Sequence, residues 1–347
     1  MGSAVIFYDP IYLEHKTGYG HPERPERLSA SMSALHDSGI LEKVEVKTPR
    51  KAKVEEISLV HDMQYIGEVR RMSESGGGHL DLDTALSSSS YEAALKACGA
   101  LLDSVDGVLS GEFKSSLCLV RPPGHHALPA RGMGFCLFNN IAIAAKYAIS
   151  KHKVSRVMIV DWDAHHGNGT QEVFYEDNSV LYTSLHQFPH YPGTGWVEEI
   201  GRGKGLGKTI NFPFPAGTGE EHYIEAFERV IIPAGIKFSP DIVMISAGYD
   251  SHTDDLLCSM RLVDGSYRKM TELLLGLAGE SASGRLIVTL EGGYDLRAMG
   301  RSVVQTAAGL AGFEITPVET EPPTTAYAEK AAEIIAEAER LWLKFSG

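Results

Sequence analysis

Short apolar runs rich in β-branched residues recur along the chain, and longer helix-like stretches lie between them. The runs predict strands at 4–8, 116–120, 156–161, 179–184, 209–212, 241–246 and 285–290. The stretches between them predict helices at 91–109, 137–151, 221–237, 264–280 and 298–311. Strands that alternate with helices indicate an α/β fold, in which a mainly parallel sheet is covered by helices on both faces.

No internal repeat or Pro/Gly-rich linker interrupts this alternation, so we expect one domain over 1–347. The segment 315–325 is rich in Thr, Pro and Glu and predicts a spacer. A last helix is expected at about 326–345.

Chemically reactive residues follow five of the predicted strands. The loops read RPPGHHA after 116–120, DWDAHHGNGT and SLHQF after the next two strands, and AGYDSHTDD and EGGYD after the last two. Open parallel sheets bind ligands beyond the carboxyl ends of their strands. We therefore expect these loops to meet at one edge of the sheet.

The loop DWDAHH carries the pattern of a metal site. Side chains alternate faces along extended backbone, so Asp161, Asp163 and His165 can share one side. Two of these with Asp250, the carboxylate that follows AGY, make a three-ligand site that leaves a coordination position open, as catalytic zinc requires. The alternative is that the acids only cap helices, and the matching HH, GYD and GGY motifs argue against it.

These motifs, together with GFCLFNN and PGTG, stand in the order seen in histone deacetylase-like amidohydrolases, and residues 5–312 resemble that family. HPERPERL at 21–28 resembles its N-terminal segment, and NGT after DAHH is closer to the class II branch and its bacterial relatives. The resemblance implies the arginase/deacetylase-like fold with an active site at the carboxyl ends of the strands. It also implies a hydrolase that removes acetyl or other acyl groups from lysine side chains or related amines.

The resemblance implies a ligand set and a proton-transfer pair. Asp163, His165 and Asp250 would bind Zn²⁺, with Fe²⁺ as the alternative. His126 would act as general base and then general acid, and His125 as its electrostatic partner. The residues behind this pair are expected to be Asp161, which would orient His125, and Asn168, which would sit behind His126.

Amide hydrolysis also needs a donor for the developing oxyanion, and the hydroxyl of Tyr294 is the candidate. The alternative is a buried core tyrosine. Part of the class II branch carries His at this place, so the Tyr favours catalysis over a catalytically weak reader of acyl-lysine. Asp255 is expected beside the site but outside the ligand set, because Asp250 is closer to the strand end.

A narrow apolar channel is expected to hold the acyl-lysine methylenes. Gly134 and Phe135 resemble one wall of that channel, and Tyr191 is expected opposite, with Phe188 as the competing choice. Leu257 lies where polyamine-preferring relatives carry an acidic residue, which favours acyl-lysine over acetylpolyamine. Asp83, or else Asp81, is the candidate for a carboxylate at the rim that holds a substrate backbone.

Other positions resemble accessory sites of the family. K⁺ is expected on Ser184 and Leu185 together with the backbone carbonyls of Asp161, Asp163 and His165. A second such site would fall at Phe174, Asp177 and Val180. Arg27 resembles an arginine that lines the product channel, with a structural ion pair as the alternative. His21, His61 and His186 are expected to be structural.

The composition excludes several classes of partner. With 45 acidic and 32 basic residues the formal net charge is −13, whereas nucleic-acid binding leaves a basic footprint. No stretch approaches the roughly 18 apolar residues of a membrane span. The four cysteines show no CxxC spacing, so we expect free thiols and a cytoplasmic protein, with the oligomeric state open.

Two rival functions remain from the sequence. An arginase-like hydrolase with two Mn²⁺ ions needs a carboxylate two positions after the ligand His, but Gly167 stands there and His252 stands two positions after Asp250. A catalytically inactive reader would have lost a catalytic residue, and every proposed one is present. A small-amide or acetylpolyamine hydrolase shares the chemistry and differs only at the rim.

Overall fold

Eight parallel strands form the central sheet, in the order β2-β1-β5-β10-β9-β6-β7-β8. The computed structural model describes residues 4–318 and 323–345, so residues 319–322 of the expected spacer and the last two residues of the chain lie outside it. The strands are β1 Ala4–Phe7, β2 Glu45–Lys47, β5 Ser115–Cys118, β6 Val157–Asp161, β7 Val180–Gln187, β8 Thr209–Phe214, β9 Ile242–Ala247 and β10 Leu286–Leu290. Every residue of β5, β6, β9 and β10 is buried, because helices cover both faces of the sheet. The predicted α/β fold with a mainly parallel sheet is confirmed.

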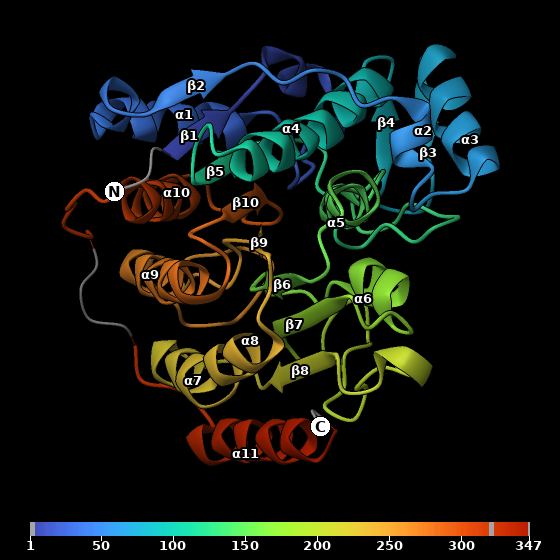
Figure 1. The fold of residues 1–347 in the computed structure, drawn as a ribbon. Helices are drawn as coiled ribbons and strands as arrows, with labels where there is room; N and C mark the ends of the chain where they lie inside the picture. Colours follow the sequence, from blue (N-terminus) through green and yellow to red (C-terminus); the bar gives the residue numbers. More distant parts are fainter. Residues whose placement is uncertain (1–3, 319–322, 346–347) are drawn as a thin grey trace.

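Helices form a layer on each face of this sheet (Figure 1). The chain forms α1 Glu26–Asp37, α2 Val54–Ile57, α3 Met63–Glu74, α4 Ser90–Ser110, α5 Asn140–His152, α6 Asn168–Phe174, α7 Glu220–Ala226, α8 Ile232–Phe238, α9 Asp264–Ser281, α10 Leu296–Ala311 and α11 Ala328–Phe345. One layer contains α1, α10, α9, α8 and α7, and the other contains α4, α5 and α6. At the β8 edge, α11 packs against β8 and α7.

Some elements differ from the pattern in the sequence. The helix expected at 221–237 is divided into α7 and α8 by a π-helical turn at Phe227–Ile231, next to Pro233, which cannot donate a backbone hydrogen bond. The short antiparallel pair β3 Gly77–His79 and β4 Ala85–Ser87 was not predicted, nor were α1, α3 and β2. No helix within the described ranges is long and apolar enough to span a membrane.

The sheet order explains why the reactive loops meet. The strands β5, β10, β9, β6 and β7 are contiguous in the sheet, and four of the five motifs begin at or just after the carboxyl ends of β5, β10, β9 and β6. SLHQF was expected as a loop, but β7 extends to Gln187, so this motif forms the carboxyl end of the strand itself. Since all run in the same direction, their carboxyl ends lie at one edge. The side chains described below are therefore brought together from distant positions of the chain, such as Arg27 and Gly293, which are 266 residues apart.

Candidate active site

Asp163, His165 and Asp250 form the centre of the site at this edge. Their ligand atoms all lie within 4.8 Å of one another, and the three residues are buried. His165 Nδ1 lies 3.0 Å from Asp163 Oδ1 and 3.0 Å from Asp250 Oδ2. The other oxygens are held by backbone amides, because Gly292 N donates to Asp163 Oδ2 at 2.8 Å and Ala164 N donates to Asp250 Oδ1 at 2.9 Å. One nitrogen and two oxygens are thereby left facing a common point.

This donor set fits a divalent metal ion. Burial raises the pKa of Asp250 to about 7, so the ionised carboxylate that a metal requires is unfavourable here without a cation. The two neighbouring glycines leave room for the carboxylates. A Cβ on Gly248 would collide with Asp163 Oδ2, and a Cβ on Gly292 would collide with Asp250 Oδ2. Two carboxylate oxygens and one imidazole nitrogen suit Zn²⁺ or Fe²⁺ and leave a position for substrate.

Two adjacent histidines lie over this cluster, their ring centroids 4.0 Å apart. His125 Nδ1 donates to Asp161 Oδ2 at 3.0 Å, and His126 Nδ1 donates to Asn168 Oδ1 at 2.8 Å. Each ring therefore carries its proton on Nδ1 in the neutral form, which leaves Nε2 unprotonated, and His125 Nε2 lies 3.9 Å from Asp163 Oδ1. The partners that the sequence predicted for the two rings are the ones that they contact.

The different partners separate the pKa values of the two rings. Burial lowers the pKa of His125, but the carboxylates of Asp161 and Asp163 outweigh burial and raise it to about 10. Burial also lowers the pKa of His126, and the neighbouring His125 and His165 lower it further. His125 is thus suited to remain a cation, while His126 is suited to offer a lone pair at neutral pH.

Glu291 holds the loop that carries His125 and His126, and no motif in the sequence assigned this role to it. Its Oε2 accepts hydrogen bonds from Gly124 N at 2.7 Å and from His125 N at 3.2 Å, and Ser246 Oγ donates to Oε1 at 3.0 Å. Burial raises the pKa of this carboxyl to about 7. Glu291 was visible in the LEGGYD motif, but its partners come from the ends of two other strands.

A cavity of about 230 Å³ leads to the cluster from the surface. It is lined by Asp83, His126, Gly134, Phe135, His165, His190, Tyr191, Leu257 and Tyr294. All of the residues predicted for the channel and rim are among these. Phe188, the competitor of Tyr191, packs instead on Trp196 with centroids 4.9 Å apart.

Tyr294 reaches the cavity from the loop after β10. Its ring lies 6.0 Å from the Phe135 ring and 5.2 Å from the Arg27 guanidinium carbon. Its backbone N donates to Asp255 Oδ2 at 2.7 Å, and the preceding Gly293 has φ +112°, which only glycine adopts easily. Asp255 thus lies beside the site and holds this loop, outside the ligand set.

His190 lines the cavity and Cys258 lies behind it, and no sequence motif pointed to either residue. Cys258 Sγ lies 3.6 Å from His165 Nε2 and 3.6 Å from His190 Nε2. Burial raises the pKa of this thiol to about 12, so it stays protonated. His190 thus brings a polar ring to a channel for which only apolar walls were expected.

Arg27 is fully buried beneath the Tyr294 loop. Its Nε donates to Gly293 O at 2.7 Å and its guanidinium pairs with Glu23 at 3.0 Å. Glu23 in turn pairs with the buried Arg121. The sequence left two roles open for Arg27, a structural ion pair and a place beside the site. Its guanidinium makes the ion pair with Glu23 and also lies next to the Tyr294 ring.

The two predicted potassium positions lie at opposite ends of β7, the first beside this centre and the second at the start of the strand. Ser184 is paired with Asp161 between β6 and β7, and its Oγ contacts His186 Nδ1 at 2.9 Å, while Leu185 follows in β7. Asp177 pairs with Lys146 at 2.6 Å, in the region of Phe174 and Val180. The two potassium sites stay predictions.

The fold and the site define an α/β protein with a candidate metal centre at the carboxyl ends of its parallel strands. Residues 21–310 match the histone deacetylase domain family. A probable deacetylase of Archaeoglobus fulgidus is 40% identical over 92% of this chain and 89% of its own length. The histone deacetylase-like amidohydrolase of Pseudomonas aeruginosa is 37% identical over 93% and 92%.

A human relative and a solved structure agree with this assignment. The human polyamine deacetylase HDAC10 is 38% identical over 92% of this chain and 49% of its own length. The crystal structure of an HDA15 HD domain superimposes with a TM-score of 0.92 at 35% identity, and covers 99% of this chain and 96% of that one. The chain belongs to the histone deacetylase family and is a hydrolase that acts on amide bonds, as the sequence resemblance implied.

Proposed function

We propose that the protein is a zinc-dependent amidohydrolase that removes acetyl or other acyl groups from lysine side chains. The observation that carries this proposal is the convergence of three kinds of group on one cavity: the Asp163, His165 and Asp250 donors, the His126 imidazole and the Tyr294 ring. Bound Zn²⁺ would polarise the scissile carbonyl and acidify a water molecule.

The remaining steps belong to side chains of the protein. The substrate methylenes lie between the rings of Phe135 and Tyr191, which line the cavity. His126 keeps its Nδ1 proton on Asn168, so its Nε2 takes a proton from the attacking water and then delivers it to the departing amine. His125, held by Asp161, keeps positive charge beside the reacting carbonyl.

Tyr294 supplies the hydrogen bond to the developing oxyanion. No group among the described residues accepts a hydrogen bond from its hydroxyl, while burial raises the pKa of that hydroxyl and keeps it protonated. Tyr294→Phe should therefore lower kcat by about 100-fold or more with the metal content unchanged. Steady-state hydrolysis of a fluorogenic acetyl-lysine substrate, with elemental analysis of the same sample, measures both.

Tyr327→Phe is the matched control, since Tyr327 is exposed and does not line the cavity. It removes a tyrosine hydroxyl and should leave kcat unchanged. A Tyr294→Phe enzyme with full activity would exclude this role. A wild-type protein that holds zinc but turns over no acyl-lysine would favour the reader function.

An acetylpolyamine hydrolase is the second candidate, because a relative is named polyamine deacetylase. At the rim, Leu257 is part of the cavity wall and offers no charge to an internal ammonium group. We therefore expect a higher kcat/KM for an acetyl-lysine peptide than for acetylspermidine when the two compete. The reverse preference would assign the polyamine function.

A further inference from the structure

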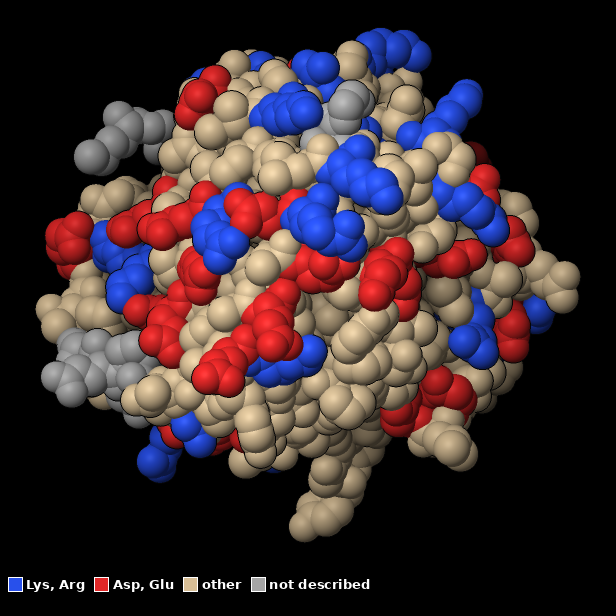
Figure 2. Space-filling model, turned by 90° about the horizontal axis from the view of Figure 1, so that it is seen from below, with Lys and Arg blue, Asp and Glu red and all other residues tan. Residues whose placement is uncertain are grey.

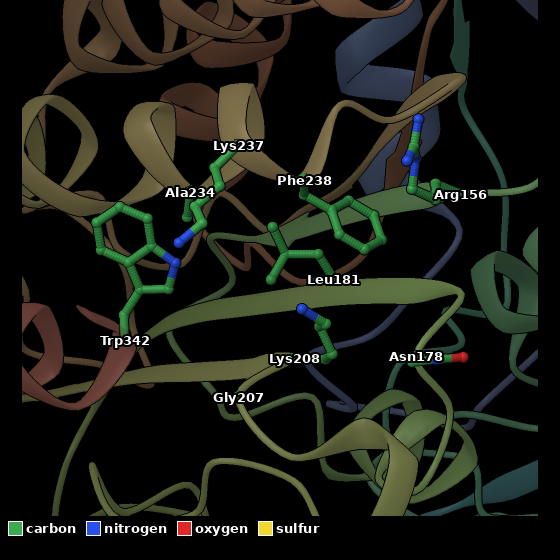
Figure 3. A pocket seen from close by; sticks show the side chains of 9 residues that line it. All are labelled: Arg156, Asn178, Leu181, Gly207, Lys208, Ala234, Lys237, Phe238 and Trp342. Atoms are coloured by element: carbon green, nitrogen blue, oxygen red, sulfur yellow. The ribbon is translucent and has the colours of Figure 1, made fainter. Parts of the chain in front are cut away.

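Two cavities besides the channel lie near opposite ends of β7. One has a volume of about 310 Å³ and lies around Lys208 and Trp342, where the chain enters the strands (Figure 3). None of the residues that line it belongs to the candidate active site. The other has a volume of about 490 Å³, and Asn168, Thr194 and Glu199 are among the residues that line it. Since Asn168 holds the general base, this second cavity borders the catalytic groups from behind.

Residues 188–199, the Tyr191 loop, carry one wall of the channel. This loop follows β7, contains neither helix nor strand, and places His190 and Tyr191 on the channel. The centroids of the Tyr191 and His126 rings are 5.1 Å apart, so the position of the loop decides how close the wall comes to the general base. The PGTG motif at 192–195 belongs to the same loop and has no part in the proposed chemistry.

The carboxylate of Glu199 ties the Tyr191 loop to α6. Its Oε1 accepts hydrogen bonds from Gly195 N at 3.0 Å and from Trp196 N at 2.9 Å, within the loop. Its Oε2 accepts a hydrogen bond from Gln171 Nε2 at 2.6 Å, in α6. Hydrogen bonds to a carboxylate are stronger than those between neutral groups. One side chain therefore holds the end of a loop without regular structure on a helix.

The same contacts fix the proton of a buried histidine, His166. A carboxylate oxygen only accepts, so the amide nitrogen of Gln171 must face Glu199 and its Oε1 must face His166 Nε2, 3.0 Å away. The amide oxygen also only accepts, so the neutral His166 ring carries its proton on Nε2, and its Nδ1 accepts from Thr194 Oγ1 at 2.8 Å. Gly195 allows this approach, because a Cβ there would lie 2.5 Å from His166 Cγ.

This chain of hydrogen bonds joins the Tyr191 loop to the segment that carries the catalytic groups. His166 directly follows the proposed ligand His165. Gln171 lies in α6, whose first residue Asn168 holds the general base. The other end of the chain is the turn that follows Tyr191 in the sequence. The chain of bonds therefore sets the position of the channel wall relative to the metal cluster.

We propose that Glu199 is a positioning residue that holds the Tyr191 loop against the metal-ligand segment and so fixes the width of the acyl-lysine channel. Glu199 does not line that channel, so it acts on a substrate through Tyr191 and His190. This role rests on the proposed deacylation, but ligands that are not turned over also report the shape of the channel. A loosened wall must be ordered again when a chain binds along it, which weakens binding and leaves the chemical step intact.

Glu199→Ala tests this role, because it removes the acceptor of all three hydrogen bonds. KM for an acetyl-lysine peptide should rise about tenfold, while kcat should change by less than about threefold. Octanohydroxamate, whose alkyl chain occupies the channel, should bind about tenfold more weakly to the zinc-loaded variant. Acetohydroxamate lacks this chain and should bind equally well to variant and wild type, since the metal site is unchanged.

Glu198→Ala is the matched control. Glu198 is the adjacent acid, is exposed, and is close enough to Arg340 of α11 to interact with its charge. Acidic side chains are common on the α11 side of the molecule, so the loss of one of them there changes little (Figure 2). This variant should leave KM and both hydroxamate affinities unchanged.

Thr194→Val is a second variant, which removes only the hydroxyl that donates to His166. It should give the same pattern with a change of at least about threefold, and it decides the question if Glu199→Ala lowers the unfolding midpoint. Unchanged KM and octanohydroxamate affinity in both variants, or an equal loss for the two hydroxamates, would overturn the proposal. The expected hydroxamate pattern in a protein that hydrolyses no acyl-lysine would support this role of Glu199 and contradict the proposed function.

Discussion

His125 and His126 are neighbours in sequence, yet their environments prepare them for opposite protonation states. Asp161 is a carboxylate and stabilises the cationic form of His125, whereas Asn168 is neutral and only orients His126. The pKa of His125 is raised to about 10, and that of His126 is lowered. The difference between a carboxylate and an amide behind the two rings thus assigns charge stabilisation to His125 and proton transfer to His126.

Asn168→Asp should move the acidic limb of the activity profile upward. A carboxylate at this position favours protonated His126 and raises its pKa by about one unit or more. Because the base must be neutral, the pH at which kcat/KM reaches half its plateau should rise by about one unit. Asn178→Asp adds the same charge at the far edge of the sheet and should leave the profile unchanged. An unshifted acidic limb would show that His126 is not the base.

The site residues that belong to local sequence motifs could be predicted, while the site residues that only tertiary contacts bring to the cavity could not. Asp163 and His165 are two positions apart in one loop, so extended backbone alone places them together. Glu291 acts through amides more than 160 residues away, and His190 and Cys258 meet only because two rim loops fold over the cavity. Nothing local distinguishes such residues from ordinary core or surface side chains.

The loop that carries Tyr294 is the element on which turnover depends most. Asp255 accepts hydrogen bonds from Tyr294 N at 2.7 Å, Asp295 N at 3.4 Å and Leu257 N at 2.9 Å. It therefore ties the oxyanion donor to the loop that forms the opposite rim. This contact lies outside the proposed ligand set, so loop order and metal binding can be separated by mutation.

Asp255→Asn should lower kcat by about tenfold while zinc stays at one per chain, because hydrogen bonds to a charged acceptor are replaced by weaker ones. Asp254→Asn is the control, an adjacent acid that is partly exposed and pairs with Arg301. Kinetics and elemental analysis of both variants measure the effect. Loss of zinc from Asp255→Asn would make Asp255 a ligand, and unchanged kcat would remove its role in positioning Tyr294.

Elements with a strong apolar pattern were predictable, and those with weak patterns were not. β6, β9 and β10 are continuous apolar runs because the sheet is buried on both faces. α3 is polar on most of its surface, and β2 has only three residues with two of them exposed. Such elements form because neighbours provide a packing surface, which a local window does not contain.

At the scale of the whole molecule, the order of the strands turns five separate loops into one site. The sequence could predict that the loops share an edge, but only the contiguous order β5-β10-β9-β6-β7 shows that they are adjacent. The organisation of 1–347 as one domain stays a prediction.

His61 predicts a pH-dependent loss of stability. It accepts from Asn139 N through Nε2 at 2.8 Å and is 2% exposed, and burial lowers its pKa to about 4. In the unfolded chain the pKa of His61 is about 6.5, so as the pH falls the unfolded state binds this proton before the folded state does. Stability from this group is complete above pH 6.5 and is lost as pH falls toward 4, by about 2 kcal/mol between pH 7 and 5.

Thermal unfolding midpoints of wild type and His61→Gln at pH 7 and pH 5 measure this term. The wild-type midpoint should fall more over this interval, since groups common to both proteins cancel in the difference. Equal falls in the two proteins would show that His61 is not held neutral by the fold.

Metal content measured together with turnover tests the central claim most directly. We predict one zinc or iron ion per chain in the wild type, acetate release from an acetyl-lysine substrate that a hydroxamate blocks, and loss of both metal and activity in Asp250→Ala. Two manganese ions per chain, or an Asp250→Ala variant that keeps stoichiometric zinc, would contradict the ligand set proposed for this site.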